Sequence, residues 1–154
     1  MKFTQIIFDV TDKIATITLN RPEARNALAP QMRVELAEAM DHIKKKAGED
    51  IKAVILTGAG GAFCAGGDVK SMGSRLHSAS KARAALRDDQ QKMFGFMNLE
   101  LPVISLIDGA AAGAGANIAL AADFVLATPK GFLMQAFVRI GVVPEWGGMY
   151  ILPK

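Results

Sequence analysis

The chain has one cysteine, few aromatic residues and no long apolar run. The single cysteine, Cys64, rules out a disulfide within the chain and favours a reducing compartment, so we expect a cytoplasmic protein. Although 51% of the residues are hydrophobic, no apolar stretch reaches the ~18 residues of a membrane-spanning helix. The first residues, Met1 to Thr4, lead straight into strand-like alternation without the apolar core of a signal peptide. We therefore expect a globular protein with no membrane partner.

The chain also lacks a strong excess of positive or negative charge, because its formal net charge is only +3 at pH 7. A nucleic-acid-binding surface usually combines a basic stripe with aromatic side chains that stack on bases. Here aromatic residues make up 6% of the chain, and the basic residues are dispersed apart from Lys44, Lys45 and Lys46. We therefore expect no nucleic-acid partner.

Strand-like and helix-like segments alternate along the chain, which is typical of an α/β fold. Residues 3–10 and 13–20 are rich in Ile, Val and Thr and predict a hairpin. Apolar residues at helical spacing predict helices over residues 30–47 and 78–99, and the second is expected to end before Pro102. Other expected elements are strands at 52–57, 103–107, 123–127 and 132–137, a helix in the second half of 109–122, and a helix start near 147. No segment repeats another in sequence.

Two turns rich in small residues each follow an expected strand. They comprise residues 58–68 and residues 109–117. Small residues let the backbone approach a ligand closely, and N–H groups at such turns can bind an oxyanion. One N–H from each turn, aimed at a single oxygen, would form an oxyanion hole. The alternative is that each turn is only a tight connection.

Other glycine-dependent or nucleophilic sites are not supported by the sequence. Neither turn carries the Gly-Lys-Ser/Thr of a phosphate-binding loop, and Ile118 breaks the dinucleotide-binding pattern. No Gly-x-Ser-x-Gly motif occurs, and His42 falls on an expected helix while His77 directly precedes another. Cys64 lacks a His or Asn placed to activate it, so we interpret it as a small buried side chain.

Four motifs together resemble the enoyl-CoA hydratase/isomerase (crotonase) superfamily. Residues 20–28 (NRPEARNAL) are similar to its opening signature, and residues 63–68 (FCAGGD) to its first oxyanion-hole segment. Residues 108–123 resemble its second oxyanion-hole segment, and residues 142–148 (VVPEWGG) its third active-site loop. The motifs follow the family's order over nearly the whole chain. What a typical member has in addition is a C-terminal helical region that packs over the site and builds the trimer.

The resemblance implies a crotonase (ClpP-like) fold, a spiral of β-β-α units. Residues 1–154 would form an acyl-CoA-binding core, which we expect to be truncated at its C-terminus because Lys154 falls where a helix begins. The partners implied are an acyl-CoA thioester substrate and further copies of the chain, in a homotrimer or hexamer. No metal and no cofactor are implied, because coenzyme A is part of the substrate. Processing of fatty acid thioesters is the implied metabolic setting.

Site residues follow from the same resemblance. The oxyanion donors would be the N–H groups of Gly67 and Ala114. The residues expected along the coenzyme A are Ala24, Ala65, Gly66 and Asp68, with the adenine near Ala65 and Asp68. The residues expected to line the acyl pocket are Asn117, Phe137 and Trp146.

Carboxylates separate the reactions within this family. Hydratases have two Glu residues around a water, at the positions of Asn117 and Phe137 in this chain. Two carboxylates are needed to hold a water and move its proton, so hydration is not favoured. Replacing Asn117 by Ala is accordingly expected to keep most of the rate, since Asn117 either anchors the acyl group or is only a helix residue.

One carboxylate, Glu145, matches the acid found in some double-bond isomerases. It can take a proton from one carbon of the acyl chain and return it to another. The oxyanion donors are expected to lower the activation free energy more than the base does, because each contributes roughly 3–4 kcal/mol in comparable systems. The simpler alternative for Glu145 is a solvent-exposed loop acid. The sequence thus predicts an isomerase that uses Glu145 as acid and base, with a hydratase or a non-catalytic acyl-CoA-binding module as alternatives.

Overall fold

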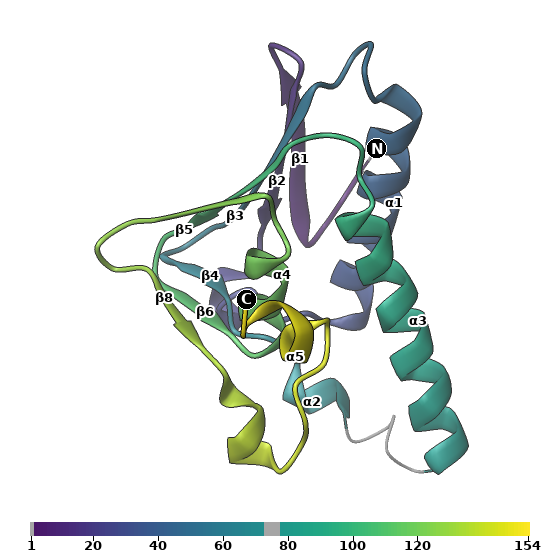
Figure 1. Cartoon of the computed structure of the whole chain (residues 1–154), viewed down its shortest axis with the longest axis vertical. Helices are drawn as coiled ribbons and strands as arrows, with labels where there is room; N and C mark the ends of the chain where they lie inside the picture. Colours follow the sequence, from purple (N-terminus) through teal and green to yellow (C-terminus); the bar gives the residue numbers. More distant parts are fainter. Residues whose placement is uncertain (1, 73–77) are drawn as a thin grey trace.

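The computed structural model describes residues 2–72 and 78–154, and the statements below concern these residues. Figure 1 shows two sheets with helices packed beside them. The larger sheet has the strand order β1-β2-β3-β5-β7, and the smaller sheet has the order β4-β6-β8. All neighbouring strands are parallel except β1 and β2.

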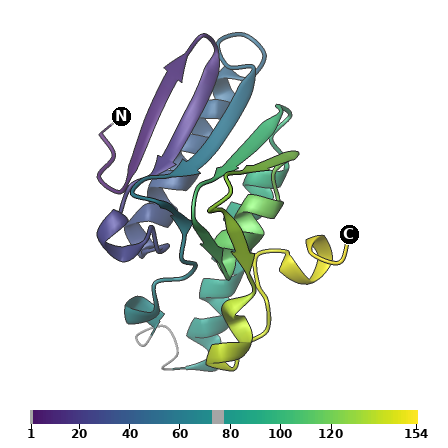
Figure 2. The same ribbon diagram turned by 90° about the vertical axis from the view of Figure 1, so that its left-hand side faces the viewer.

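The chain begins with the expected hairpin, formed by β1 (Ile6–Thr11) and β2 (Ile14–Leu19). Asp12 and Lys13 connect the strands with φ values of 50° and 65°, which suit a two-residue hairpin turn. Alternate residues of β2 point into the core, so that Ala15, Ile17 and Leu19 are buried. Figure 2 shows the hairpin at one side of the molecule, with helices behind the sheet.

Three further pairs of strands follow one pattern, in which a strand of the larger sheet leads directly into a strand of the smaller sheet. The pairs are β3 (Ala53–Gly58) with β4 (Ala62–Cys64), β5 (Val103–Ile107) with β6 (Ala110–Ala112), and β7 (Phe124–Ala127) with β8 (Phe132–Met134). A helix comes after each pair. This arrangement confirms the expected spiral of β-β-α units. The smaller sheet consequently lies beyond the C-terminal ends of the parallel strands.

The helices fill the positions between these strand pairs. After β2 comes α1 (Pro30–Lys46), and after β4 come α2 (Val69–Met72) and α3 (Ala79–Met97). After β6 comes α4 (Ala114–Leu120), and after β8 come the 3₁₀ helix η2 (Ala136–Ile140) and α5 (Gly148–Ile151). Another 3₁₀ turn, η1 (Pro22–Ala24), precedes α1. None of the helices in the described ranges combines the length and apolar content of a membrane span.

The N-terminal segment is fixed to α1 by the carboxylate of Glu35, whose side chain is buried. Its oxygens accept hydrogen bonds from the backbone N–H groups of Thr4 (3.0 Å), Gln5 (2.8 Å) and Ile6 (3.1 Å). The Thr4 hydroxyl and the Gln31 amide also donate to it. Burial alone would raise the pKa of Glu35, but these hydrogen bonds outweigh burial and lower the pKa from 4.5 to about 2.

The structure corrects two sequence-based expectations. Residues 58–68 were expected to be a loop, but β4 lies within them and pairs with β6. Residues 132–137 were expected to be one strand, but β8 ends at Met134, and Phe137 lies in η2. The last hydrogen bond to β8 runs from Gly113 N–H to Met134 C=O at 2.8 Å, and the chain then turns at Gln135 into η2.

Candidate active site

The two glycine-rich turns lie directly against each other at the ends of β4 and β6. Gly66 has a φ of +93°, and a Cβ atom on it would lie 2.7 Å from the Ala112 oxygen and 3.4 Å from the Ala114 nitrogen. A Cβ atom on Gly115 would overlap Cys64. Only glycine therefore allows the backbones of the two turns to approach this closely.

Each turn carries a backbone N–H that the resemblance identifies as an oxyanion donor and that has no backbone acceptor among the described residues. These are the N–H groups of Gly67 and Ala114. Around Gly67, Leu28 N–H donates to Gly66 C=O (2.8 Å) and Asp68 N–H donates to Leu28 C=O (3.4 Å). Ala114 is the first residue of α4, so its N–H precedes the bonds within that helix. Two such donors on touching turns are the arrangement that an oxyanion hole requires.

The first motif holds the first turn in position through Asn26, which is fully buried. Its side-chain amide donates to the backbone oxygens of Ala59 and Ala62, both at 2.8 Å. Its side-chain oxygen accepts from Arg21 N–H at 2.8 Å. Residues 20–28 therefore brace residues 59–67, which explains why the two motifs occur together.

The residues expected along the coenzyme A differ in their surroundings. Ala65 is exposed, and its N–H bonds the oxygen of Arg25, which follows the partly exposed Ala24. Asp68 is partly buried, and its carboxylate pairs with the Arg21 guanidinium at 3.2 Å. Gly66 is buried, because it faces the second turn. The fold thus brings Ala24 and Ala65 to one surface, and their contact with coenzyme A stays a prediction.

The loop that carries Glu145 is attached to α4 by Asn117, which is fully buried. The Asn117 amide donates to the backbone oxygen of Glu145 at 2.6 Å, and the Asn117 oxygen accepts from Gln135 at 2.8 Å. A Cβ atom on Gly148 would overlap Asn117. Since Asn117 lies three residues after Ala114 on the same helix, the Glu145 backbone is held about one helical turn from Ala114, the second predicted oxyanion donor. Glu145 is partly buried and interacts with other groups in the fold.

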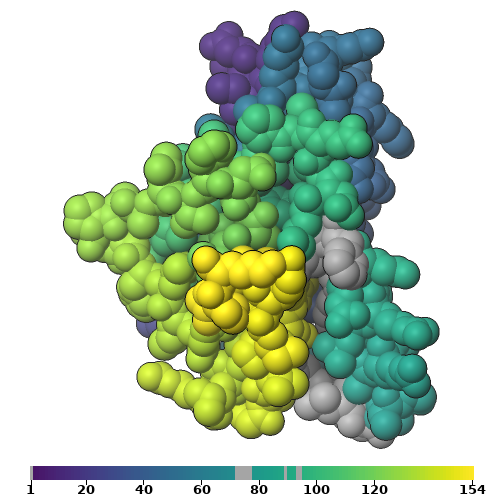
Figure 3. All heavy atoms as spheres, in the orientation of Figure 1, coloured from purple at the N-terminus to yellow at the C-terminus, as the bar shows by residue number. Residues whose placement is uncertain are grey.

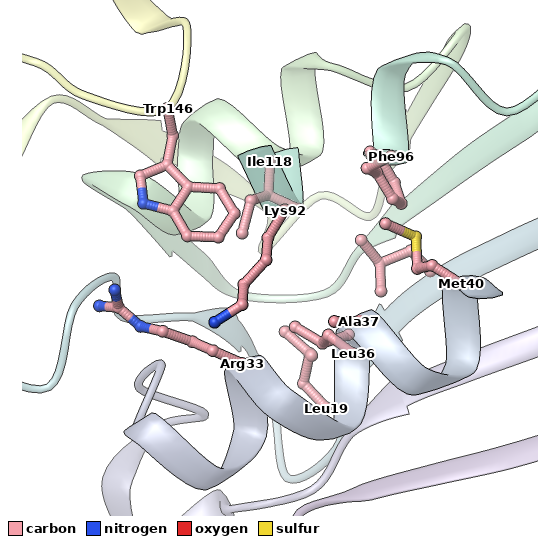
Figure 4. Close-up of a pocket in the computed structure, with 10 residues that line it drawn as sticks. Leu19, Arg33, Leu36, Ala37, Met40, Lys92, Phe96, Ile118 and Trp146 are labelled. Carbon is pink, nitrogen blue, oxygen red and sulfur yellow. The ribbon is translucent and has the colours of Figure 1, made fainter. Parts of the chain in front are cut away.

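Trp146 occupies an unusual backbone conformation for a bulky residue, with a φ of 55°. Such strain persists only where the surroundings fix it, and it clusters at functional sites. The Trp146 ring is 7% exposed, and the Arg33 guanidinium lies 5.9 Å from the ring centroid. Figure 4 shows both residues at one end of a small apolar cavity.

The remaining candidates pack rather than react. Phe137 is buried, with its ring about 3.8 Å from the position of a Cβ atom on Gly113. Burial raises the pKa of the Cys64 thiol to about 12, so the thiolate form is scarce, and the interpretation of Cys64 as a buried packing residue is confirmed. The His42 ring packs edge-on against Phe8 of β1, and His77 lies outside the described residues. No group of His, Cys, Asp or Glu in ranges 2–72 and 78–154 could hold a metal ion.

Three residues of this site were not assigned from the sequence, namely Asn26, Gln135 and Arg33. A signal for Arg33 was present, because it occurs with Leu36, Ala37 and Met40 at the spacing of one apolar helix face. A charge within such a face indicates a buried cation. Asn26 and Gln135 gave no comparable signal, since their partners are far away in sequence.

Comparison with known proteins gives consistent matches. The family model described as Enoyl-CoA hydratase/isomerase matches residues 9–154. The chain is 40% identical to a probable enoyl-CoA hydratase of Rhodobacter capsulatus, over the whole chain and 58% of that protein. It is 36% identical to the trans-2-decenoyl-[acyl-carrier-protein] isomerase of Streptococcus mutans, over the whole chain and 59% of that protein. The chain therefore spans somewhat more than half the length of these relatives.

Solved structures match equally well. The enoyl-CoA hydratase/isomerase of Cupriavidus metallidurans superimposes with a TM-score of 0.90 at 29% sequence identity. The match covers 99% of this chain and 57% of that chain.

Proposed function

The chain belongs to the enoyl-CoA hydratase/isomerase family, and we propose that it isomerises the double bond of an enoyl-CoA thioester. One observation gives this proposal its main support. Two backbone N–H groups without acceptors in the described structure, those of Gly67 and Ala114, lie on turns that touch each other. Donors fixed in this way stabilise the negative charge that develops on a thioester oxygen.

In the proposed reaction, the thioester oxygen accepts hydrogen bonds from Gly67 and Ala114. The Glu145 carboxylate removes a proton from C2 of a 3-enoyl thioester, and the electron pair of the C–H bond moves onto the thioester oxygen to give a dienolate. The protonated Glu145 then returns the proton to C4, which leaves a 2-enoyl thioester and a regenerated carboxylate. Coenzyme A would lie along Ala24, Ala65, Gly66 and Asp68, while Asn117, Phe137 and Trp146 border the acyl group.

Isomerisation is favoured over hydration by the residues near α4 and η2. Asn117 has a neutral amide whose donor and acceptor are both engaged in the fold. Phe137 has no group that could hold a water. Neither position therefore carries the carboxylate that a water-adding enzyme of this family would have there. Hydration is the second candidate, because the 40% identical relative bears that name.

Assembly into a homotrimer or hexamer is part of the same proposal. All four residues of β7 are exposed, and many large apolar side chains between residues 124 and 152 are exposed as well. Figure 3 shows this C-terminal segment, coloured light green to yellow, on the face of the molecule turned to the viewer. An exposed apolar surface of this kind is typical of an interface. Sedimentation of a stable monomer at micromolar concentration would contradict this part.

Incubation with 3-enoyl-CoA in deuterated water tests the reaction. Isomerisation is expected to raise the absorbance of the conjugated 2-enoyl thioester and to allow deuterium into the acyl chain. Parallel incubation with 2-enoyl-CoA tests for water addition, which would support the hydratase instead. Binding of acyl-CoA without either change would favour a non-catalytic binding module.

A further inference from the structure

A small cavity adjoins Trp146. It has a volume of about 30 Å³ and is bounded by β2, β3, α1, α3, α4 and the loop after η2. The side chains that line it are mainly apolar, among them Leu19, Leu36, Ala37, Met40, Phe96 and Ile118. A cavity of this size holds about two water-sized groups, and an apolar one accepts hydrocarbon in preference to water. It therefore suits the end of an alkyl chain.

The two basic residues at the border of the cavity do not change this character, because their charged groups already have partners. Arg33 Nε donates to Leu28 C=O at 3.1 Å, and Arg33 has further interactions in the fold. Lys92 Nζ pairs with the Asp88 carboxylate at 2.6 Å. The aliphatic parts of such side chains can border an apolar space. The cavity thus favours methylene groups over a charged or polar group.

The Trp146 ring forms one end of the cavity, as Figure 4 shows. The residue before it is Glu145, the proposed acid and base, whose backbone oxygen is bound by Asn117. Ile118, the next residue on α4, lines the cavity beside Trp146. The cavity and the proposed site therefore share the same loop and the same helix, with the indole ring at their boundary.

The backbone at Trp146 indicates that the bulk of this side chain has a role. Its φ of 55° is unusual for a large residue, whereas glycine adopts such a conformation without strain. Strained positions persist where the surroundings fix them, and they cluster at functional sites. The ring is 7% exposed, so it fills space inside the fold. A large ring at a position better suited to glycine thus points to a blocking function.

We propose that Trp146 limits the acyl-chain length of the substrate by closing the apolar cavity to the acyl group. This inference rests on the proposed function, which puts the thioester at Gly67 and Ala114 and the reacting carbons at Glu145. An acyl chain that continues past C4 then meets the indole ring. The substrate class is thus a short, unbranched enoyl-CoA that ends close to C4.

Calorimetric titration of the full chain with butyryl-CoA and octanoyl-CoA tests the proposal. The two thioesters differ only in the length of a saturated chain. Wild type is expected to bind octanoyl-CoA no more tightly than butyryl-CoA, because the added carbons find no apolar space. Trp146→Ala opens the cavity to the chain. Each methylene group moved from water into an apolar space tightens binding about fourfold, so two of them should favour octanoyl-CoA about 15-fold in this variant.

Ala37→Leu is the matched control, because Ala37 lines the cavity from α1 and a larger side chain fills it. In wild type this substitution should leave the ratio of the two affinities unchanged, since the acyl chain does not reach the cavity. Combined with Trp146→Ala, it should remove most of the gain. If Trp146→Ala does not fold in thermal unfolding measurements, Trp146→Gly carries the test, because glycine suits the φ of 55°.

Three results overturn the inference and leave the proposed function intact. The first is a clear preference of wild type for octanoyl-CoA, and the second is the same ratio in Trp146→Ala as in wild type. The third is a gain in Trp146→Ala that Ala37→Leu does not reduce, because the chain would then lie elsewhere. If neither thioester binds to wild type, both proposals fall.

Discussion

The side-chain amide of Asn117 holds the backbone oxygen of Glu145 at 2.6 Å. The two residues are 28 positions apart, yet this bond fixes the loop bearing the proposed acid and base to the helix bearing the second proposed oxyanion donor. Gln135 completes the arrangement by donating to Asn117 at 2.8 Å. Asn117, at the position where the resemblance to the family implies a hydratase carboxylate, therefore holds the loop through its amide.

Asn117→Ala is consequently expected to weaken activity, although the sequence alone suggested little effect. The substitution removes the donor to Glu145 C=O and leaves Gln135 without its acceptor, which should cost about 1–3 kcal/mol in the free energy of unfolding. We expect a lower kcat at unchanged affinity for a saturated acyl-CoA, because the residues proposed to contact coenzyme A lie elsewhere. Steady-state kinetics with thermal unfolding measures both quantities. Full activity at unchanged stability would show that the loop does not depend on Asn117.

The lowered pKa of Glu35 predicts that the folded chain loses stability at low pH. The pKa of Glu35 is lowered to about 2 in the folded chain from 4.5, so the folded state prefers the carboxylate more strongly than the unfolded state does. This contribution is fully present above pH 4.5, where it corresponds to about 3 kcal/mol. It is lost as the pH falls from about 4.5 to about 2. Denaturant unfolding at a series of pH values measures it.

Glu35→Gln should remove most of this pH dependence, because an amide does not titrate. The control is Asp50→Asn, which removes a carboxylate of an exposed ion pair and should have little effect. If wild type and Glu35→Gln lose stability in parallel between pH 4.5 and pH 2, Glu35 is not the responsible group.

Periodicity predicted the hairpin and α1 well, because alternate residues of β2 and every third or fourth residue of α1 face the core. It could not predict β4 and β6, since runs such as Ala110–Ala112 have little intrinsic strand preference. They become strands because they pair with each other, with glycine allowing the adjoining turns to approach. The motifs suggested that Gly67 and Ala114 are the oxyanion donors, which stays a prediction, whereas the contact of Asn117 with Glu145 depended on a partner distant in sequence.

Removal of either oxyanion N–H should reduce turnover. Proline lacks the N–H, and Ala114→Pro places it at the first position of α4, where helices tolerate proline. We expect kcat to fall about 10²–10³-fold for Ala114→Pro and for Gly67→Pro. Gly67→Ala keeps the N–H and is the matched control, with a much smaller expected loss. A folded Ala114→Pro variant with full activity would exclude this N–H from the reaction.

Glu145 is expected to be the essential carboxylate of the isomerisation. Glu145→Gln retains the size and hydrogen-bonding capacity of the side chain but cannot accept the C2 proton, so kcat should fall about 10²–10⁴-fold. Glu145→Asp should keep part of the activity, since a shorter carboxylate reaches the same carbon after a small shift. The exposed Glu49 supplies the control, and Glu49→Gln should behave as wild type. Deuterium incorporation into 3-enoyl-CoA measures proton transfer directly, and it should be lost in Glu145→Gln while acyl-CoA binding persists. If Glu145→Gln instead exchanges deuterium at the wild-type rate, another base removes the proton, and the single-carboxylate mechanism is wrong.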